Sequence, residues 1–187
     1  MLGLPEILAL ALGLALDAFA VCLVAGATGA ATDPRAVFRL SFHFGLFQFL
    51  MPVLGWLLGS TVVELIAPVD HWIAFGLLAL VGGKMIREGL GNEETSLGTN
   101  PTRGWTLVSL SVATSLDALA VGLSLALVGT SIWLPAAIIG VLTALLCLLG
   151  IVLGRTVAAH LGGKVEVLGG LVLLGIGLRI LWVHLGL

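Results

Sequence analysis

The sequence has very little charge. Asp, Glu, Lys and Arg make up 10% of its 187 residues, whereas 59% are hydrophobic and the mean hydropathy is +1.21. A soluble domain needs a far larger charged surface, and the longest polar stretch is too short to fold alone. The basic residues form no patch that would indicate nucleic acid as a partner. The composition therefore excludes a soluble protein and places the chain in a lipid bilayer.

Cysteine and clustered histidine are scarce as well. Cys22 and Cys147 both lie inside apolar runs, which predicts two buried free thiols rather than a disulfide framework. The four histidines are scattered, whereas a zinc site needs His and Cys side chains at close spacing. The first apolar run also lacks the positively charged leader of a signal peptide, so it is expected to be a retained membrane span.

What the sequence has instead is long apolar runs. Six of them are each long enough to cross the hydrocarbon core, which takes about 20 helical residues. Each is expected to be a helix, because backbone groups inside a bilayer must be satisfied within their own segment. The predicted fold is an all-α integral membrane protein with six transmembrane helices, at residues 3–27, 38–62, 70–88, 105–128, 133–155 and 165–185.

Positive charge sets the expected orientation. All but one of the eight Lys and Arg residues flank the first, third and fifth connections between these runs. Basic residues favour cytoplasmic connections, so both termini are expected outside. The residues concerned are Arg35, Arg39, Lys84, Arg87, Arg103, Arg155 and Lys164.

The two halves of the sequence resemble each other. "LDAFAV" (Leu16–Val21) matches "LDALAV" (Leu116–Val121), and "LMPVLGWLLGSTV" (Leu50–Val62) is similar to "LLCLLGIVLGRTV" (Leu145–Val157). Three spans is an odd number, so the second half is expected to be inverted in the membrane. The predicted organisation is a first repeat at 1–90, a cytoplasmic linker at 91–104 and a second, inverted repeat at 105–187. Inverted repeats are typical of transporters, although duplication in a purely structural protein is an alternative.

Asp17 and Asp117 occupy equivalent places in the two halves. At a rise of 1.5 Å per residue, both are expected near the bilayer midplane. An aspartate there costs at least about 2.5–3.5 kcal/mol on insertion scales, so two of them indicate a compensating role. Small neighbouring residues would let the helices approach closely. The alternative is that each carboxyl group only hydrogen-bonds another helix.

Further polar residues share this depth. The repeat pairs Gln48 with Thr143, and Thr114 lies on the same helical face as Asp117. Carboxylates with neutral oxygens suit hard divalent cations such as Mg²⁺, Ca²⁺ or Mn²⁺ better than zinc or copper. The alternative for each neutral residue is that it only hydrogen-bonds a neighbouring helix. The alternative for Glu88 and Glu166 is an interfacial ion pair. The predicted metal ligands are Asp17, Asp117, Gln48, Thr143 and Thr114, followed by Ser124, Cys147, Met51, Glu88 and Glu166.

Five stretches together carry a family resemblance. They are "LALDAFAV" (Leu14–Val21), "FGLFQFLMPVLGW" (Phe44–Trp56), "HWIAFGLLALVGGKMIREG" (His71–Gly89), "ATSLDALAVG" (Ala113–Gly122) and "EVLGGLVLLGIG" (Glu166–Gly177). The whole chain resembles the MntP-type manganese efflux pumps of the LysE-like exporter superfamily. The resemblance implies six helices, a bacterial inner membrane, Mn²⁺ as transported substrate and no enzymatic activity or cofactor. The family's paired aspartates map onto Asp17 and Asp117. Some members carry glutamate where this chain has Gln48, and Arg179 is unexpected at its position.

The expected mechanism is alternating access. Mn²⁺ would bind between the two aspartates, and the return step would carry protons, because two close carboxylates in a dry site do not both stay ionised. The expected partners are manganese, the lipid bilayer and protons, and the sequence does not fix an oligomeric state. Alternatives are an exporter of another divalent cation or of an amino acid. An intramembrane aspartyl protease is a further alternative, although its GxGD-type signature is absent.

Overall fold

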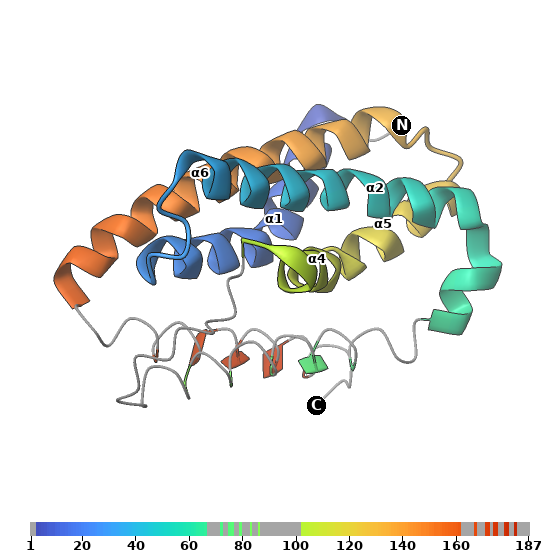
Figure 1. Cartoon of the computed structure of the whole chain (residues 1–187). Coiled ribbons are helices and arrows are strands. Elements are labelled where there is room, and N and C mark those ends of the chain that lie inside the picture. The colour runs from blue at the N-terminus through green and yellow to red at the C-terminus, as the bar shows by residue number, and fades with distance from the viewer. Residues whose placement is uncertain are drawn as a thin grey trace.

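The computed structural model describes residues 3–66 and 102–161, together with single helical residues within 72–86 and 167–182. This part of the chain contains helices and turns and no strand, in agreement with the predicted all-α fold. Figure 1 shows the helices side by side as a bundle. They are α1 (Leu4–Ala27), α2 (Pro34–Ile66), α4 (Gly104–Ala113), α5 (Leu116–Leu127) and α6 (Trp133–Leu161).

Three of these helices are long and apolar enough to cross a membrane. The segments are Leu4–Ala27, Pro34–Gly59 and Trp133–Thr156, with hydropathies of 2.6, 1.4 and 2.8. They confirm helices at the predicted spans 3–27, 38–62 and 133–155. The helix α2 continues beyond a kink at Gly59, where φ is 62°. The predicted spans 70–88 and 165–185 lie largely outside the described residues.

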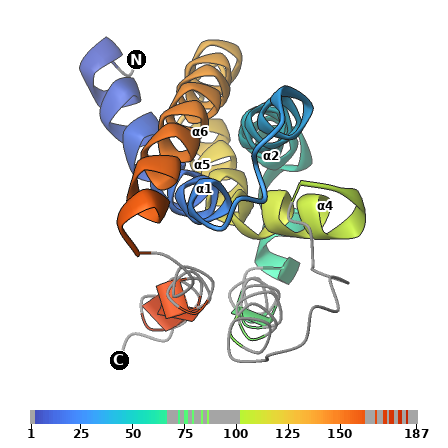
Figure 2. The same ribbon diagram turned by 60° about the vertical axis from the view of Figure 1, so that its left-hand side comes forward.

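The predicted span at 105–128 is helical, but it is not one continuous helix. The chain forms α4 and α5 instead, bent by 43° at a break between them, and Figure 2 shows α4 running at an angle to α5. Hydroxyl side chains explain the break. Ser111 Oγ donates to Leu107 O (2.8 Å), Thr114 Oγ1 donates to Leu110 O (2.9 Å), and Ser115 Oγ donates to Ser111 O. Such back-bonding competes with the helical ladder and bends helices.

The equivalent stretch of α1 has no hydroxyl group. The positions 100 residues before Ser111, Thr114 and Ser115 are Ala11, Leu14 and Ala15. Without competing side-chain donors, α1 stays continuous over 24 residues. The two halves therefore differ at this point for a reason that is local and chemical.

Glycines bring the two halves into backbone contact. The helix α1 packs mainly on α6, and α5 packs on α2. A methyl group built on Gly150 of α6 would lie 2.8 Å from Phe19 O and 3.2 Å from Leu23 N. One built on Gly55 of α2 would overlap Leu119 O and lie 3.2 Å from Leu123 N. The same contact thus occurs twice, between residues at repeat-equivalent positions.

A third contact relates α2 to α6 directly. A methyl group on Gly45 would lie 2.8 Å from Gly140 O, and one on Gly140 would lie 2.8 Å from Gly45 O. The next contacts are also matched, with Ala144 Cβ at 2.9 Å and Phe49 Cβ at 2.9 Å. Reciprocal contacts of this kind are what a two-fold relation would produce. Only glycine permits this backbone approach, because any side chain would collide.

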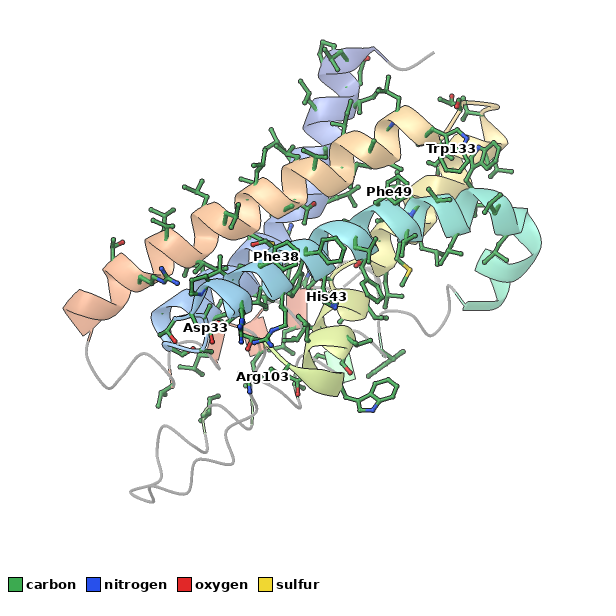
Figure 3. The ribbon with its side chains drawn as sticks, turned by 45° about the horizontal axis from the view of Figure 1, so that its top comes forward. Asp33, Phe38, His43, Phe49, Arg103 and Trp133 are labelled. Carbon is green, nitrogen blue, oxygen red and sulfur yellow. The ribbon has the colours of Figure 1, made fainter. Side chains whose placement is uncertain are left out.

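The connections gather at opposite ends of the bundle. At one end, Arg155 Nη2 donates to Ala31 O (2.6 Å) and Thr32 O (3.2 Å), which ties the last part of α6 to the α1–α2 connection. At the other end, Trp56 Nε1 donates to Thr130 O (3.0 Å) in the α5–α6 connection. Figure 3 shows the same separation, with Asp33 and Arg103 far from Trp133.

Candidate functional site

Gln48 links α2 to α1 and to the break between α4 and α5. Its side chain is fully buried on α2. Its Nε2 donates to Leu14 O of α1 (2.7 Å) and to Thr114 O at the α4–α5 break (3.2 Å). Leu14 and Thr114 are 100 residues apart, at equivalent places in the repeat. One amide nitrogen therefore connects matching points of the two halves.

The hydrogen bonds fix the orientation of this amide. Both partners are carbonyl oxygens, which only accept, so the NH₂ group must face them and Oε1 must face away. Gln48 Oε1 is buried and has no hydrogen-bond partner in the described part of the chain. Thr143 Oγ1, at the repeat-equivalent position on α6, is buried and unpartnered there too. Buried oxygens are normally satisfied, so two unsatisfied ones at matched positions indicate a place for a ligand.

Asp17 follows Leu14 by three residues on α1. Its side chain is 18% exposed, and its Oδ1 lies 3.9 Å from Nη1 of Arg179, whose side chain is 71% exposed. The contact accounts for the basic residue in the last apolar run, whose role the sequence left open. An ion pair with so exposed a partner is weak and exchangeable.

Asp117 follows Thr114 by three residues, and the break decides its surroundings. It lies half-buried in the first turn of α5, and its Oδ1 accepts a hydrogen bond from the backbone N–H of Ala118 (2.9 Å). The start of a helix carries partial positive charge, which favours a carboxylate. The break thus turns a mid-span aspartate into one at the N-terminal end of a half-helix, and broken helices with released carbonyls are common at transporter substrate sites.

The structure distributes the remaining predicted ligands unevenly. The Thr114 hydroxyl is engaged with Leu110 O, so its backbone oxygen and not its side chain contacts Gln48. Ser124 is exposed and donates to Ala120 O (3.0 Å). Cys147 is buried in a cluster with Cys22, and both are free thiols. Met51 packs at the edge of another apolar cluster.

Two predicted residues, Glu88 and Glu166, lie outside the described residues. Within residues 3–66, 102–161 and the single described positions, no three His, Cys, Asp or Glu side chains converge as a metal cluster would require. The printed partners of Gln48 are neutral carbonyl oxygens, and Asp17 and Asp117 each follow one of those carbonyls by three residues in the sequence.

Sequence reasoning singled out Gln48 and Thr143 through the repeat as candidate ligands, and it did not point to the backbone carbonyls of Leu14 and Thr114, which contact Gln48 in the structure. A carbonyl has no side-chain signature. The available signal was the run of hydroxyl residues in "SLSVATS" (Ser109–Ser115), which marks where a helix is prone to break and release its carbonyls.

Comparison with known proteins gives a consistent picture. The family described as "Putative manganese efflux pump" matches residues 31–181. A protein of Syntrophotalea carbinolica named "Putative manganese efflux pump MntP" is 57% identical over 176 residues, which is 94% of each chain. A protein of the same name from Nitratidesulfovibrio vulgaris (strain DP4) is 53% identical over 96% of this chain and 90% of its own.

A more distant relative with that name, from Gloeothece citriformis, is 44% identical over 95% of this chain and 94% of its own. No solved structure matches the chain. Identity of this extent along nearly the full length establishes the family, which comprises transporters and not enzymes. The chain belongs to the MntP family of manganese efflux pumps.

Proposed function

We propose that the protein exports Mn²⁺ from the cytoplasm across a bacterial inner membrane. The observation that carries the proposal is the position of Gln48, whose amide connects the segments preceding Asp17 and Asp117 and whose Oε1 is left unpartnered. Relatives named as manganese efflux pumps support the identity of the ion.

The proposed ligands are Asp17, Asp117, Gln48 Oε1 and Thr143 Oγ1, with the Thr114 carbonyl beside them. All are oxygens, as a hard divalent cation prefers. The unpartnered state of Gln48 Oε1 and Thr143 Oγ1 fits a site whose ligand is transient cargo. The weak Arg179 contact gives Asp17 a counter-charge that Mn²⁺ displaces on binding.

The proposed architecture has six spans in two inverted repeats, 1–90 and 105–187, with a cytoplasmic linker at 91–104. The matched contacts of Gly55 and Gly150, and the reciprocal pair of Gly45 and Gly140, support a two-fold relation between the halves. The bond from Arg155 to Ala31 supports a common side for the first and fifth connections. With basic residues on that side, both termini lie outside.

The proposed mechanism is alternating access with proton counter-transport. The half-helix pair α4 and α5 and the packed pair α1 and α6 rock about the Gly45–Gly140 crossing, which alternately opens the site to each side. After release, at least one aspartate takes up a proton, because two carboxylates near each other in a dry site repel. Proton entry offsets the membrane potential, which opposes cation exit by about 2.3 kcal/mol per charge per 100 mV.

The test is ion flux in proteoliposomes that hold the purified full chain. Mn²⁺ movement is followed with an internal fluorescent chelator, with and without an imposed pH gradient, against Mg²⁺, Ca²⁺ and lysine as competing substrates. We expect Mn²⁺ flux that a pH gradient accelerates and that Asp117→Asn abolishes. Lysine flux without Mn²⁺ flux would replace metal export by amino-acid export, and flux indifferent to pH would remove the proton step alone.

A further inference from the structure

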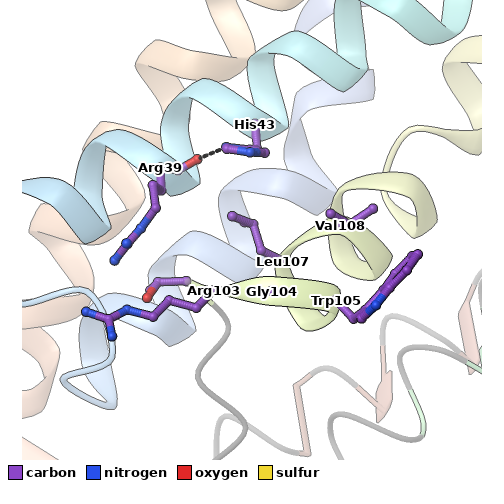
Figure 4. A pocket seen from close by; sticks show the side chains of 8 residues that line it. Arg39, His43, Arg103, Gly104, Trp105, Leu107 and Val108 are labelled. Atoms are coloured by element: carbon purple, nitrogen blue, oxygen red, sulfur yellow. Dashed lines mark hydrogen bonds between the residues drawn. The ribbon is translucent and has the colours of Figure 1, made fainter.

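A cavity lies beside the N-terminal part of α2, before Gln48 in the sequence. This open cavity of about 620 Å³ separates this part of α2 from the start of α4. Arg39, His43 and Arg103 supply its basic side chains, and Trp105, Leu107 and Val108 line it with apolar surface. Figure 4 shows the two arginine side chains on the same side of the cavity.

Arg39 is the unusual member of this group. Its Nε and Nη2 atoms are buried, and neither has a hydrogen-bond partner in the described part of the chain. A guanidinium group has five N–H donors and a permanent charge, so leaving two of its nitrogen atoms, which carry three of those donors, buried and unsatisfied is unfavourable. Among the described residues that line the cavity beside it, none is acidic, and Arg103 brings a second positive charge to it.

Two further groups favour negative charge there. His43 Nδ1–H donates to Arg39 O (2.8 Å), which leaves the other ring nitrogen for a different partner. The helix α4 begins at the cavity with Gly104, and the side chain of its N-cap residue, Arg103, makes no capping hydrogen bond. The start of a helix adds partial positive charge and N–H donors to a site that already has two guanidinium groups.

The repeat shows that the fold does not require these basic residues. The positions on α6 equivalent to Arg39 and His43, 95 residues later, are Leu134 and Ile138. The helix α6 of the second half thus has apolar residues at both positions. The basic cavity belongs to one end of the molecule, the end where Arg155 ties α6 to the α1–α2 connection.

We propose that this cavity binds a phosphate group, held by the guanidinium groups of Arg39 and Arg103. Arginine binds phosphate oxygens through paired N–H donors, which supplies the partners that Arg39 lacks. The shared chemistry is a phosphate anion, and it has two sources. The headgroup of an anionic phospholipid would also cover the apolar lining at Trp105 and Leu107, whereas free phosphate would use the basic groups alone.

The competing occupant is the chain's own linker. Glu93 and Glu94 precede Arg103 by about ten residues and lie outside the described residues. Their carboxylates have the same preference for arginine. A test must therefore separate a bound phosphate from an internal ion pair.

Native mass spectrometry of the full chain in detergent provides this test. Short-chain phosphatidylglycerol, short-chain phosphatidylcholine and inorganic phosphate are titrated separately. We expect saturable binding of phosphatidylglycerol or phosphate that weakens by about tenfold or more in Arg39→Gln and in Arg103→Gln, the loss of a charge-assisted pair. Arg35→Gln is the matched control, because Arg35 is exposed on the same helix and does not line the cavity.

The ligand series distinguishes the outcomes. Binding of phosphatidylglycerol that inorganic phosphate does not displace identifies a lipid site, and displacement identifies a general phosphate site. Equal weakening by Arg35→Gln, or absence of binding, overturns the proposal. Binding that appears only in a Glu93→Gln/Glu94→Gln variant assigns the cavity to the linker and also overturns it. Arg39→Lys keeps the positive charge. Binding that persists in this variant shows that the loss in Arg39→Gln is not caused by a folding defect.

Discussion

Gln48 and Thr143 occupy equivalent positions but should respond in opposite ways to loss of their polar groups. Gln48→Leu removes two buried hydrogen bonds, to Leu14 O and Thr114 O. The N–H that an unbroken helix would offer to the Thr114 carbonyl, that of Ala118, donates to Asp117 Oδ1 instead. Hydrogen bonds in membrane proteins average about 0.6 kcal/mol, and an orphaned buried carbonyl adds about 1–3 kcal/mol. We expect a total loss of roughly 2–4 kcal/mol.

Thr143→Val is the matched comparison. Thr143 Oγ1 has no partner in the described part of the chain, so the substitution removes an unsatisfied group and keeps the shape of the side chain. We expect the stability to stay within about 0.5 kcal/mol of the parent or to rise. Both variants should nevertheless bind Mn²⁺ more weakly, because each loses one proposed oxygen ligand.

The assay is reversible unfolding in mixed micelles, followed by helical circular dichroism, with Mn²⁺ binding measured on the same samples. Stability and binding are thereby separated for each variant. Equal destabilisation by Gln48→Leu and Thr143→Val would refute the hydrogen-bond assignment. Unchanged Mn²⁺ affinity in both variants would leave that assignment intact and remove these two oxygens from the metal site.

Two further predictions concern packing and charge. Gly122→Ala should destabilise the protein by about 1–3 kcal/mol, because the added methyl group meets the backbone of α2. Gly13→Ala, with open space around the added methyl group, should raise stability by about 0.5–1 kcal/mol. Thermal unfolding of both variants checks this, and equal effects would contradict it. Arg179→Gln removes the cation 3.9 Å from Asp17. We expect Mn²⁺ affinity to rise about two- to fivefold with stability unchanged, since so exposed an ion pair is weak. A fall in affinity on calorimetric titration would contradict competition between Arg179 and Mn²⁺ for Asp17.

Much of the fold followed from hydropathy. The spans at 3–27 and 133–155 coincide with α1 and with most of α6, because a bilayer admits few alternatives to a helix for a long apolar run. The break in the predicted helix 105–128 did not follow from it. Hydropathy is insensitive to whether a hydroxyl group bonds to solvent or to its own backbone, and three such back-bonds separate α4 from α5.

Part of the candidate site followed from the repeat, and its role in binding metal stays a prediction. Gln48 and Thr143 were paired by position alone, and the structure finds both buried with an unpartnered oxygen. The partner of Arg179 was not predictable, since it depends on how one helix is rotated against another. Whether Asp17 and Asp117 share one ion remains a prediction that rests on Gln48 lying between their helices.

That shared ion is the central claim, and equilibrium binding of Mn²⁺ tests it most directly. Isothermal titration of the purified chain is compared with Asp17→Asn, Asp117→Asn and the double variant, with Asp33→Asn in the exposed α1–α2 connection as control. The account predicts one Mn²⁺ per chain, a large loss of affinity in each single variant, and little further loss in the double variant. Two ions per chain, or losses that add independently, would contradict it.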